Sequence, residues 1–356
     1  MSLQSNKTGI LPIAGTENSN RDLDILFIHG LGGDALSTWQ YENNNKYFWP
    51  QALISDFPNI GIWTIGYGAT ASSWVEDVMS MEDRTENLLN LLSLKNIGKK
   101  PFVLIAHSMG GLIAKYILTQ AAQSNNPNYQ AIANNCQGIV FLAVPHNGSG
   151  WSNVLDYTRI IVRGNEIVRQ LSKDSSSLRQ LNNNFTQLSN RQGYDCYAFF
   201  ETKEVRVRKK IFWFIPFSKG IKVVSESSAS GSFLKEPAIP MDDDHLSICK
   251  LQSKEDQLYK NILRIINTYL TSCSEANANK ETSIQPSLPK SHTIQKKITE
   301  IDLSRNKNRL DRLYNQLEAM QKEYDLETRV EEKMRLEPRI EAKQNDINKI
   351  LQEVDK

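Results

Sequence analysis

The sequence predicts an α/β fold with a mostly parallel sheet flanked by helices, followed by a C-terminal helical tail. Short, nearly continuous apolar runs recur along the chain, as expected for strands covered on both faces, at 24–30, 60–68, 101–111, 137–146 and 195–203. Stretches with helical spacing lie between them, at 75–94 and 111–122. Strands that alternate with helices in this way form a parallel sheet.

Length and composition favour one large domain with an appendage. The chain has 356 residues, of which 40% are hydrophobic and 23% charged, as in ordinary globular proteins. A net charge of +2 is too balanced to indicate a nucleic-acid partner. The N-terminus lacks the apolar core of a secretory signal, and no apolar run is long enough to cross a bilayer as a helix. We therefore expect a cytoplasmic protein.

The chain divides into four segments. Residues 1–22 are rich in Asn, Ser and Thr, and we expect a polar leader that docks on the domain or stays mobile. The α/β domain covers 23–272 and carries a cap at about 151–192, where an Asn- and Ser-rich insertion breaks the regular rhythm. Residues 273–298 contain two prolines and few apolar side chains, which indicates a linker. The fourth segment is a helical tail.

This tail, residues 299–356, has the pattern of a charged helix with a narrow apolar seam. Apolar side chains recur at spacings of three and four, at Leu310, Leu313, Leu317, Met320 and Tyr324. Pro338 interrupts the second half because it has no amide hydrogen, so either two helices or one kinked helix results. An antiparallel hairpin, an intermolecular coil and a solvated spacer helix all fit the pattern. We expect the tail to bind a protein partner or to self-associate.

The strongest chemical signal is a serine at a strand-to-helix turn. In PFVLIAHSMGGLIAKYIL an apolar strand runs directly into small residues and then into an amphipathic helix, with Ser108 at the apex. So sharp a turn needs small residues two positions before and after the serine, and Ala106 and Gly110 meet this requirement. The following helix directs its free amide groups toward the serine oxygen. The alternative is an ordinary turn in which the serine only caps the helix.

A glycine-rich loop, HGLGG at 29–33, closes the first apolar run. Glycines allow backbone amides to approach a ligand, and the oxyanion of an acyl-transfer intermediate needs such donors. We expect the amides of Leu31 and Met109 to supply them. Taken alone, the loop is equally consistent with a plain glycine turn.

A nucleophilic serine needs a histidine as base. Of the five histidines, His29 lies in the glycine-rich loop, His146 follows a middle strand and His292 lies in the linker. We expect His107, which precedes the serine, to point elsewhere. His245 remains: it follows the last core strand and precedes a terminal helix. A solvated histidine in an acidic loop is the alternative reading.

The orienting carboxylate has two candidates. Glu201 ends the strand after the 137–146 run, and Glu226 follows a later apolar stretch. We prefer Glu201 because of its place in the strand order. Residues 242–244 are also acidic, but a side chain adjacent to His245 in sequence rarely folds back onto its ring.

Four motifs together resemble a known family: HGLGGD, AHSMGGL, VFLAVPHNGS and DDDHLSICK. They are similar to the α/β-hydrolase fold, and within it to lipase-like serine esterases that include the serine-active-site-containing proteins and the GPI-inositol deacylases. The resemblance covers about residues 23–270. It implies a triad of Ser108, Glu201 and His245 that acts on an ester, with no metal and no organic cofactor. Ala106 departs from the family's commonest pattern, which has glycine at that position.

An insertion after Glu201 bears on the substrate. Basic residues 206 and 208–210 precede an apolar tip, Ile211–Phe217, and such a hairpin could enter an anionic lipid headgroup region. We therefore expect an ester or lipid substrate and peripheral membrane contact. The alternative is that these aromatic residues pack on the cap around Trp151.

These observations support two functional hypotheses. The first is a serine esterase or lipase, with a weaker resemblance to effector modules of bacterial signalling or defence systems. The second is a catalytically silent platform whose helical tail acts as an adaptor or oligomerisation device, because a fold alone does not prove activity.

Overall fold

The computed structural model describes residues 8–41, 47–67, 81–146, 175–211, 215–281 and 337–345. The chain forms two compact units, 1–280 and 281–356. Within the described part of the second unit, residues 337–345 are helical. The rest of the predicted tail, 299–336 and 346–356, lies outside the described residues, and so do 151–174 of the predicted cap.

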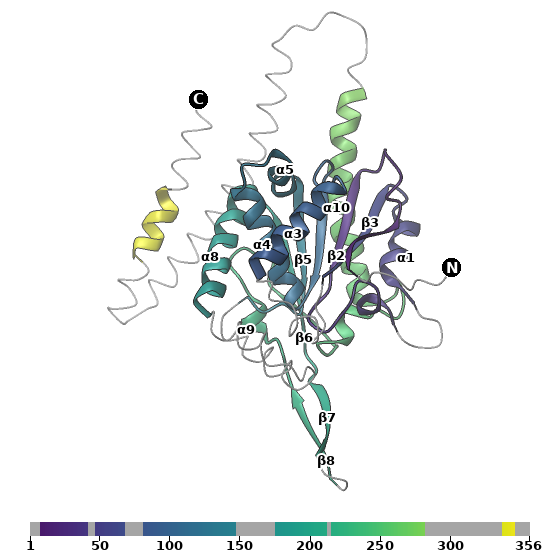
Figure 1. The fold of residues 1–356 in the computed structure, drawn as a ribbon, viewed down its shortest axis with the longest axis vertical. Helices are drawn as coiled ribbons and strands as arrows, with labels where there is room; N and C mark the ends of the chain where they lie inside the picture. The colour runs from purple at the N-terminus through teal and green to yellow at the C-terminus, as the bar shows by residue number, and fades with distance from the viewer. Residues whose placement is uncertain are drawn as a thin grey trace, which may run out of the picture. The chain divides into compact units, whose positions relative to one another are not determined.

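A mostly parallel sheet lies at the centre of the first unit (Figure 1), which confirms the predicted fold class. In the described residues it has seven strands, in the order β1 (Gly9–Ala14), β3 (Ile60–Gly66), β2 (Leu23–Ile28), β4 (Phe102–His107), β5 (Cys136–Leu142), β6 (Asp195–Glu201) and β9 (Ile239–Met241). β1 pairs antiparallel with β3, whereas the other neighbouring pairs are parallel.

The described helices of this unit lie before, between and after the strands. They are α1 (Trp49–Asp56), α3 (Met81–Leu94), α4 (Met109–Gln123), α5 (Pro127–Asn135), α8 (Ser175–Gln192), α9 (Glu226–Ala229) and α10 (Gln257–Glu281), with 3-10 turns η1 (Ser37–Trp39) and η2 (Ser247–Cys249). α10 continues to Glu281, so its last turns occupy residues for which the sequence predicts a linker.

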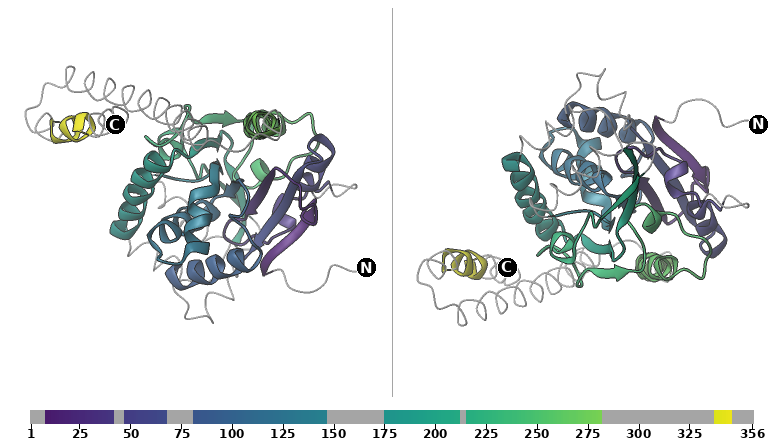
Figure 2. Two further views of the ribbon diagram at one scale, coloured as in Figure 1. Left: turned by 90° about the horizontal axis from the view of Figure 1, so that it is seen from above. Right: turned by 90° about the horizontal axis from the view of Figure 1, so that it is seen from below.

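Helices cover both faces of the sheet (Figure 2). Along β2, Ile25 and Phe27 belong to one apolar core, which includes residues of α1 and α10. Leu26 and Ile28 point the other way, into a second core with residues of α3, α4 and α5. All four side chains are fully buried. Burial on both faces explains why this strand is continuously apolar in the sequence instead of alternating.

Part of the predicted leader, for which docking on the domain and mobility were both expected, forms a strand of the main sheet. Residues 9–14 form β1, whose Ile10 pairs with Ile65 and is only 5% exposed. The strand is short, contains Pro12 and is followed by a polar stretch, so its sequence signal is weak. Edge strands tolerate proline because one side of the ladder has no partner.

A separate two-stranded hairpin follows β6. β7 (Val205–Ile211) pairs antiparallel with β8 (Ile215–Ile221), and Arg208 lies opposite Ser218. Figure 1 shows this hairpin extending away from the main sheet. It contains the predicted Ile211–Phe217 segment, of which residues 212–214 lie outside the described residues.

Candidate active site

Ser108 lies at the sharp turn between β4 and α4. Its backbone has φ 48° and ψ −122°, a combination that L-amino acids rarely adopt. The amide of Ser108 donates a hydrogen bond to the carbonyl of Leu142 on β5, at 2.9 Å, which anchors the strained turn to the neighbouring strand. Ser108 is 4% exposed.

Close backbone packing explains the small residues around this turn. A Cβ atom on Gly110 would lie 2.4 Å from the carbonyl oxygen of Ile28 and 2.6 Å from that of His29. Two positions before the serine, Ala106 is fully buried. Any larger side chain at position 110 would force α4 away from β2, so the glycine is a steric requirement of the turn.

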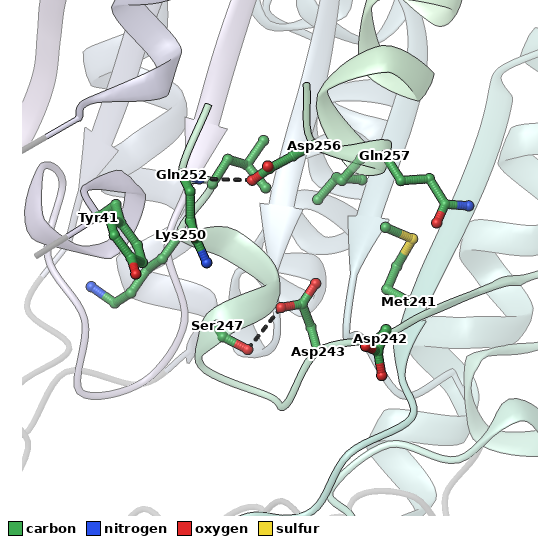
Figure 3. Close-up of a pocket in the computed structure, with 11 residues that line it drawn as sticks. Tyr41, Met241, Asp242, Asp243, Ser247, Lys250, Gln252, Asp256 and Gln257 are labelled. Carbon is green, nitrogen blue, oxygen red and sulfur yellow. Dashed lines mark hydrogen bonds between the residues drawn. The ribbon is translucent and has the colours of Figure 1, made fainter. Parts of the chain in front are cut away.

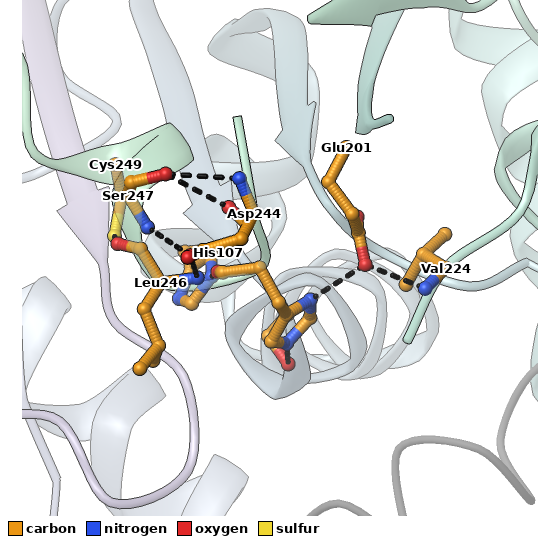
Figure 4. A network of polar contacts seen from close by, with 9 residues as sticks. His107, Glu201, Val224, Asp244, Leu246, Ser247 and Cys249 are labelled. Atoms are coloured by element: carbon orange, nitrogen blue, oxygen red, sulfur yellow. Dashed lines mark hydrogen bonds and ion pairs between the residues drawn. The ribbon is translucent and has the colours of Figure 1, made fainter. Parts of the chain in front are cut away.

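His245 contacts Ser108 from the loop between β9 and η2, residues 242–246, which we call the histidine loop. Its Nε2 lies 3.0 Å from the Oγ of Ser108. The loop is ordered by Asp244, whose Oδ1 accepts the amide hydrogens of Leu246 and Ser247, each at 2.9 Å (Figure 4). His245 is 2% exposed, so its ring is fixed by protein contacts and largely shielded from solvent.

Glu201 completes a chain of polar contacts. Its Oε1 lies 3.2 Å from Nδ1 of His245 and accepts the amide hydrogen of Val224 at 2.6 Å (Figure 4). Glu201 is fully buried at the end of β6, whereas Glu226 is exposed at the start of α9. The structure therefore brings Glu201, and not Glu226, to the histidine. A proton on Nδ1 that is donated to Glu201 leaves the Nε2 lone pair facing the serine hydroxyl.

The glycine-rich loop packs directly on the serine turn. A Cβ atom on Gly30 would lie 2.9 Å from the Cβ of Ser108, so the loop that carries Leu31 approaches the serine closely. Asp34 orders this loop by accepting the amide hydrogens of Leu36 and Ser37, at 2.9 and 2.8 Å. Met109 is the first residue of α4, where an amide has no acceptor within its own helix.

His107, which the sequence analysis expected to point away from the serine, contacts the histidine loop. Its Nε2 lies 2.8 Å from the backbone oxygen of His245. Burial lowers the pKa of His107 to about 3, and the neighbouring His245 adds to this effect. Burial also lowers the pKa of His29, to about 4, so this ring is neutral. It stacks on the ring of Tyr67, with the two ring centroids 4.4 Å apart.

A buried lysine lies further along α4. Lys115 is fully buried, and its Nζ donates to Nδ1 of His146 at 2.9 Å and to Oδ1 of Asn182 at 2.6 Å. Burial lowers the pKa of Lys115 to about 7. Three aromatic rings surround the amine, with centroids at 5.5, 5.5 and 5.0 Å: Phe141, Phe185 and Phe233. The backbone amide of His146 donates to the carbonyl of Ser228 in α9, at 2.6 Å. The cluster thus connects α4 and α8 to α9.

A cavity of about 470 Å³ lies beside the histidine loop (Figure 3). Asp242 and Asp243 line it from this loop and Ser247 from η2, together with Tyr41 and Lys250. The three residues Ser108, Glu201 and His245 are not among its lining side chains.

In the described ranges, no group of three or more His, Cys, Asp or Glu side chains could hold a metal ion. Nor is any helix of the described residues long and apolar enough to span a bilayer.

Curated relatives match most of the chain. Protein SERAC1 from Bos taurus is 32% identical over 266 residues, which are 69% of this chain and 39% of the relative. Protein SERAC1 from Homo sapiens is 31% identical over 266 residues, which are again 69% of this chain and 39% of the relative. The chain therefore spans 39% of the length of these relatives.

Solved structures of esterases and phospholipases are more distant. A carboxylesterase structure from the thaumarchaeon Nitrososphaera gargenis has 13% identity and a TM-score of 0.41, covering 75% of this chain and 95% of its own. Phospholipase PlaB from Legionella pneumophila has 17% identity and a TM-score of 0.34, covering 51% of this chain and 39% of its own.

The family assignment rests on a match to residues 22–199, which is described as the PGAP1-like alpha/beta domain. The matched range includes Leu31 and Ser108 and ends before Glu201 and His245. The mostly parallel sheet agrees with this match. The protein belongs to the PGAP1-like alpha/beta domain family, and thus to the lipase-like α/β hydrolases that its motifs resemble.

Proposed function

We propose that this protein is a serine hydrolase that cleaves carboxylic esters through a triad of Ser108, His245 and Glu201. The observation that carries the proposal is the continuous chain of contacts from Oγ of Ser108 to Nε2 of His245, at 3.0 Å, and from Nδ1 to Glu201, at 3.2 Å. Nucleophile, base and orienting acid need this order of contacts.

The reaction begins when Oγ of Ser108 attacks the ester carbonyl carbon and His245 accepts the hydroxyl proton at Nε2. Glu201 stabilises the imidazolium that forms. The carbonyl oxygen becomes an oxyanion, which accepts hydrogen bonds from the amides of Leu31 and Met109. When the carbon–oxygen bond breaks, His245 gives its proton to the leaving alcohol. Water, deprotonated by His245, then attacks the acyl-serine ester, and the acid and free Ser108 are released.

Labelling with a fluorophosphonate probe tests this assignment directly. We expect a covalent adduct on Ser108, located by peptide mass spectrometry, and no adduct in Ser108→Ala. A suitable matched control is Ser228→Ala, because Ser228 is also buried but lies in α9. Absence of an adduct from the folded, unaltered protein would contradict the enzyme proposal and favour a silent platform that acts through its tail.

The β7–β8 hairpin supports a lipid ester as the substrate. The β7 segment, Val205–Ile211, carries basic residues at 206, 208, 209 and 210. The sequence between β7 and β8 is FWF, at 212–214. Cations beside aromatic residues favour an anionic membrane surface. We propose that the hairpin contacts such a surface and brings the triad close to its substrate.

An ester screen would identify the substrate class. The panel should contain phospholipids, acylglycerols and short p-nitrophenyl esters, with Ser108→Ala as the background control. Faster turnover of lipid esters in vesicles than of soluble short esters would support the proposal. Turnover of short esters alone would restrict the proposal to a soluble esterase.

Recruitment by the tail belongs to the same proposal. We propose that residues 299–356 bind a protein partner or a second copy, in a cytoplasmic enzyme that serves a bacterial signalling or defence system. Size-exclusion chromatography with and without these residues tests self-association. An unchanged oligomeric state would remove self-association and leave partner recruitment.

A further inference from the structure

His107 connects the nucleophile turn to the loop that carries the base. It immediately precedes Ser108 at the end of β4, yet its Nε2 lies 2.8 Å from the backbone oxygen of His245, 138 positions away in the chain. The two imidazole rings are 5.1 Å apart, at an interplanar angle of 46°. His107 is 5% exposed, so water competes little for this hydrogen bond.

The contact defines the tautomer of His107. A carbonyl oxygen only accepts hydrogen bonds, so the proton must be on Nε2. In the described part of the chain, the buried Nδ1 has no hydrogen-bond partner. It faces Gly30, where an added Cβ would lie 2.9 Å from this nitrogen. The imidazole is therefore enclosed between the glycine-rich loop and the histidine loop, and it donates from one nitrogen only.

The loop of His245 needs such a contact. The ring of His245 is held by Glu201 at 3.2 Å, and the backbone beyond it is ordered by Asp244. The carbonyl of His245 itself is held by His107. Fixing this carbonyl limits rotation of the backbone that carries the imidazole, and thereby the distance from Nε2 of His245 to Oγ of Ser108.

We propose that His107 is a positioning residue, which donates a hydrogen bond to the backbone of His245 and holds the base in line with Ser108. The inference rests on the proposed triad, because it assigns His245 the role of base. A neutral ring suits this task. Burial keeps the pKa of His107 near 3, so it adds no positive charge beside His245 when that residue takes up the serine proton.

Two amide substitutions separate the donor from the other properties of the ring. His107→Gln places an amide nitrogen near the position of Nε2, so it can still reach the carbonyl of His245. His107→Asn is the matched control: it is one methylene shorter and cannot reach. In His107→Asn we expect kcat to fall by about 10- to 100-fold with KM changed less than about 2-fold, because the base is misplaced. His107→Gln should recover most of the loss, to within about 3-fold of the unaltered protein.

Histidine-selective NMR provides a readout that does not depend on activity. With five histidines in the chain, His107 should give the signature of a neutral ring protonated at Nε2 across the range in which ordinary histidines titrate. The resonances of His245 should broaden or shift in His107→Asn and less so in His107→Gln. Thermal unfolding of both variants checks that each is folded.

Three results would overturn the inference: titration of His107 near its ordinary pKa, unchanged kcat in His107→Asn, or equal losses in both folded variants. Fluorophosphonate labelling of the unaltered protein distinguishes this failure from failure of the proposed function. An adduct on Ser108 with unchanged kcat in His107→Asn rejects only the positioning role. No adduct rejects the enzyme, and with it the role assigned to His107.

Discussion

Nε2 of His245 lies 3.0 Å from Oγ of Ser108, although the two residues are 137 positions apart. Their strands are not neighbours: β5 and β6 lie between β4 and β9 in the sheet. Glu201 ends β6, in register with Met241 of β9. All three residues lie at the carboxyl ends of strands, the edge at which parallel sheets place their functional groups. The sheet order therefore determines which distant residues can meet.

Ser108→Ala and Ser108→Gly should separate catalysis from backbone strain. Both remove the nucleophile, and each should lower kcat at least about 10³-fold. Their stabilities should differ, because φ 48° and ψ −122° are strained for alanine and accessible to glycine. Relief of this strain outweighs the extra entropy that glycine loses on folding. We expect Ser108→Gly to exceed Ser108→Ala by about 1 kcal/mol in free energy of unfolding, measured by urea denaturation. Equal free energies of unfolding for the two variants would mean that the backbone at position 108 is not strained.

Glu201→Gln should impair catalysis and leave the fold intact. The amide oxygen can still accept the amide hydrogen of Val224, but the neutral side chain cannot stabilise a protonated His245. We expect kcat to fall by about 10²- to 10⁴-fold, measured on the best ester of the screen.

Glu226→Gln is the matched control for this substitution. Glu226 has the same chemistry but is exposed at the start of α9, so activity should stay within about 2-fold. A larger loss in Glu226→Gln than in Glu201→Gln would reverse the assignment of the acid.

The sequence was sufficient to predict the central strands and the serine turn, because both depend on local patterns. Burial on both faces makes strands such as β2 and β4 continuously apolar. The turn around Ser108 requires small residues at fixed positions. β1 and β9 were harder to detect, since β1 includes Pro12 and β9 is only three residues long.

Other contacts between distant residues, which no motif carries, could not be predicted in this way. The hydrogen bond from His107 to the backbone of His245 depends on how two loops meet, and no local pattern encodes it. Lys115 did leave a signal: Leu112 and Leu118, three positions to either side on the helix, are buried with it. A lysine within an apolar helix face indicates a buried amine.

The stability of the protein should depend on pH through Lys115. In the folded protein its pKa falls from 10.5 to about 7 because of burial. Between these values the unfolded chain binds more protons than the folded one, so the free energy of unfolding rises with pH by up to ~1.4 kcal/mol per unit. Below pH 7 both states hold the proton, and Lys115 contributes no slope.

Lys115→Met should remove this slope. Urea unfolding of the variant and the unaltered protein, compared between pH 7 and 10, should show a difference in free energy that changes with pH. Lys260→Met is the control, because the Lys260 side chain is 58% exposed. Parallel curves for Lys115→Met and the unaltered protein would mean that Lys115 does not lose its proton in this range.

Membrane binding should depend on the position of basic residues and not on net charge alone. Replacing Arg206, Arg208 and Lys210 with serine removes three positive charges from β7. At about 1 kcal/mol for each charge near an anionic surface, we expect partition onto anionic vesicles to fall by about 100-fold, measured by co-sedimentation. Neutral vesicles should bind both proteins equally weakly.

The matched control replaces three lysines outside the hairpin with serine. They are Lys203, Lys254 and Lys260, which form ion pairs with Asp242, Asp56 and Glu255. Because this control loses the same net charge, an equal loss of binding would indicate a non-specific charge effect. No binding by the unaltered protein would remove membrane contact from the proposal and leave a soluble esterase.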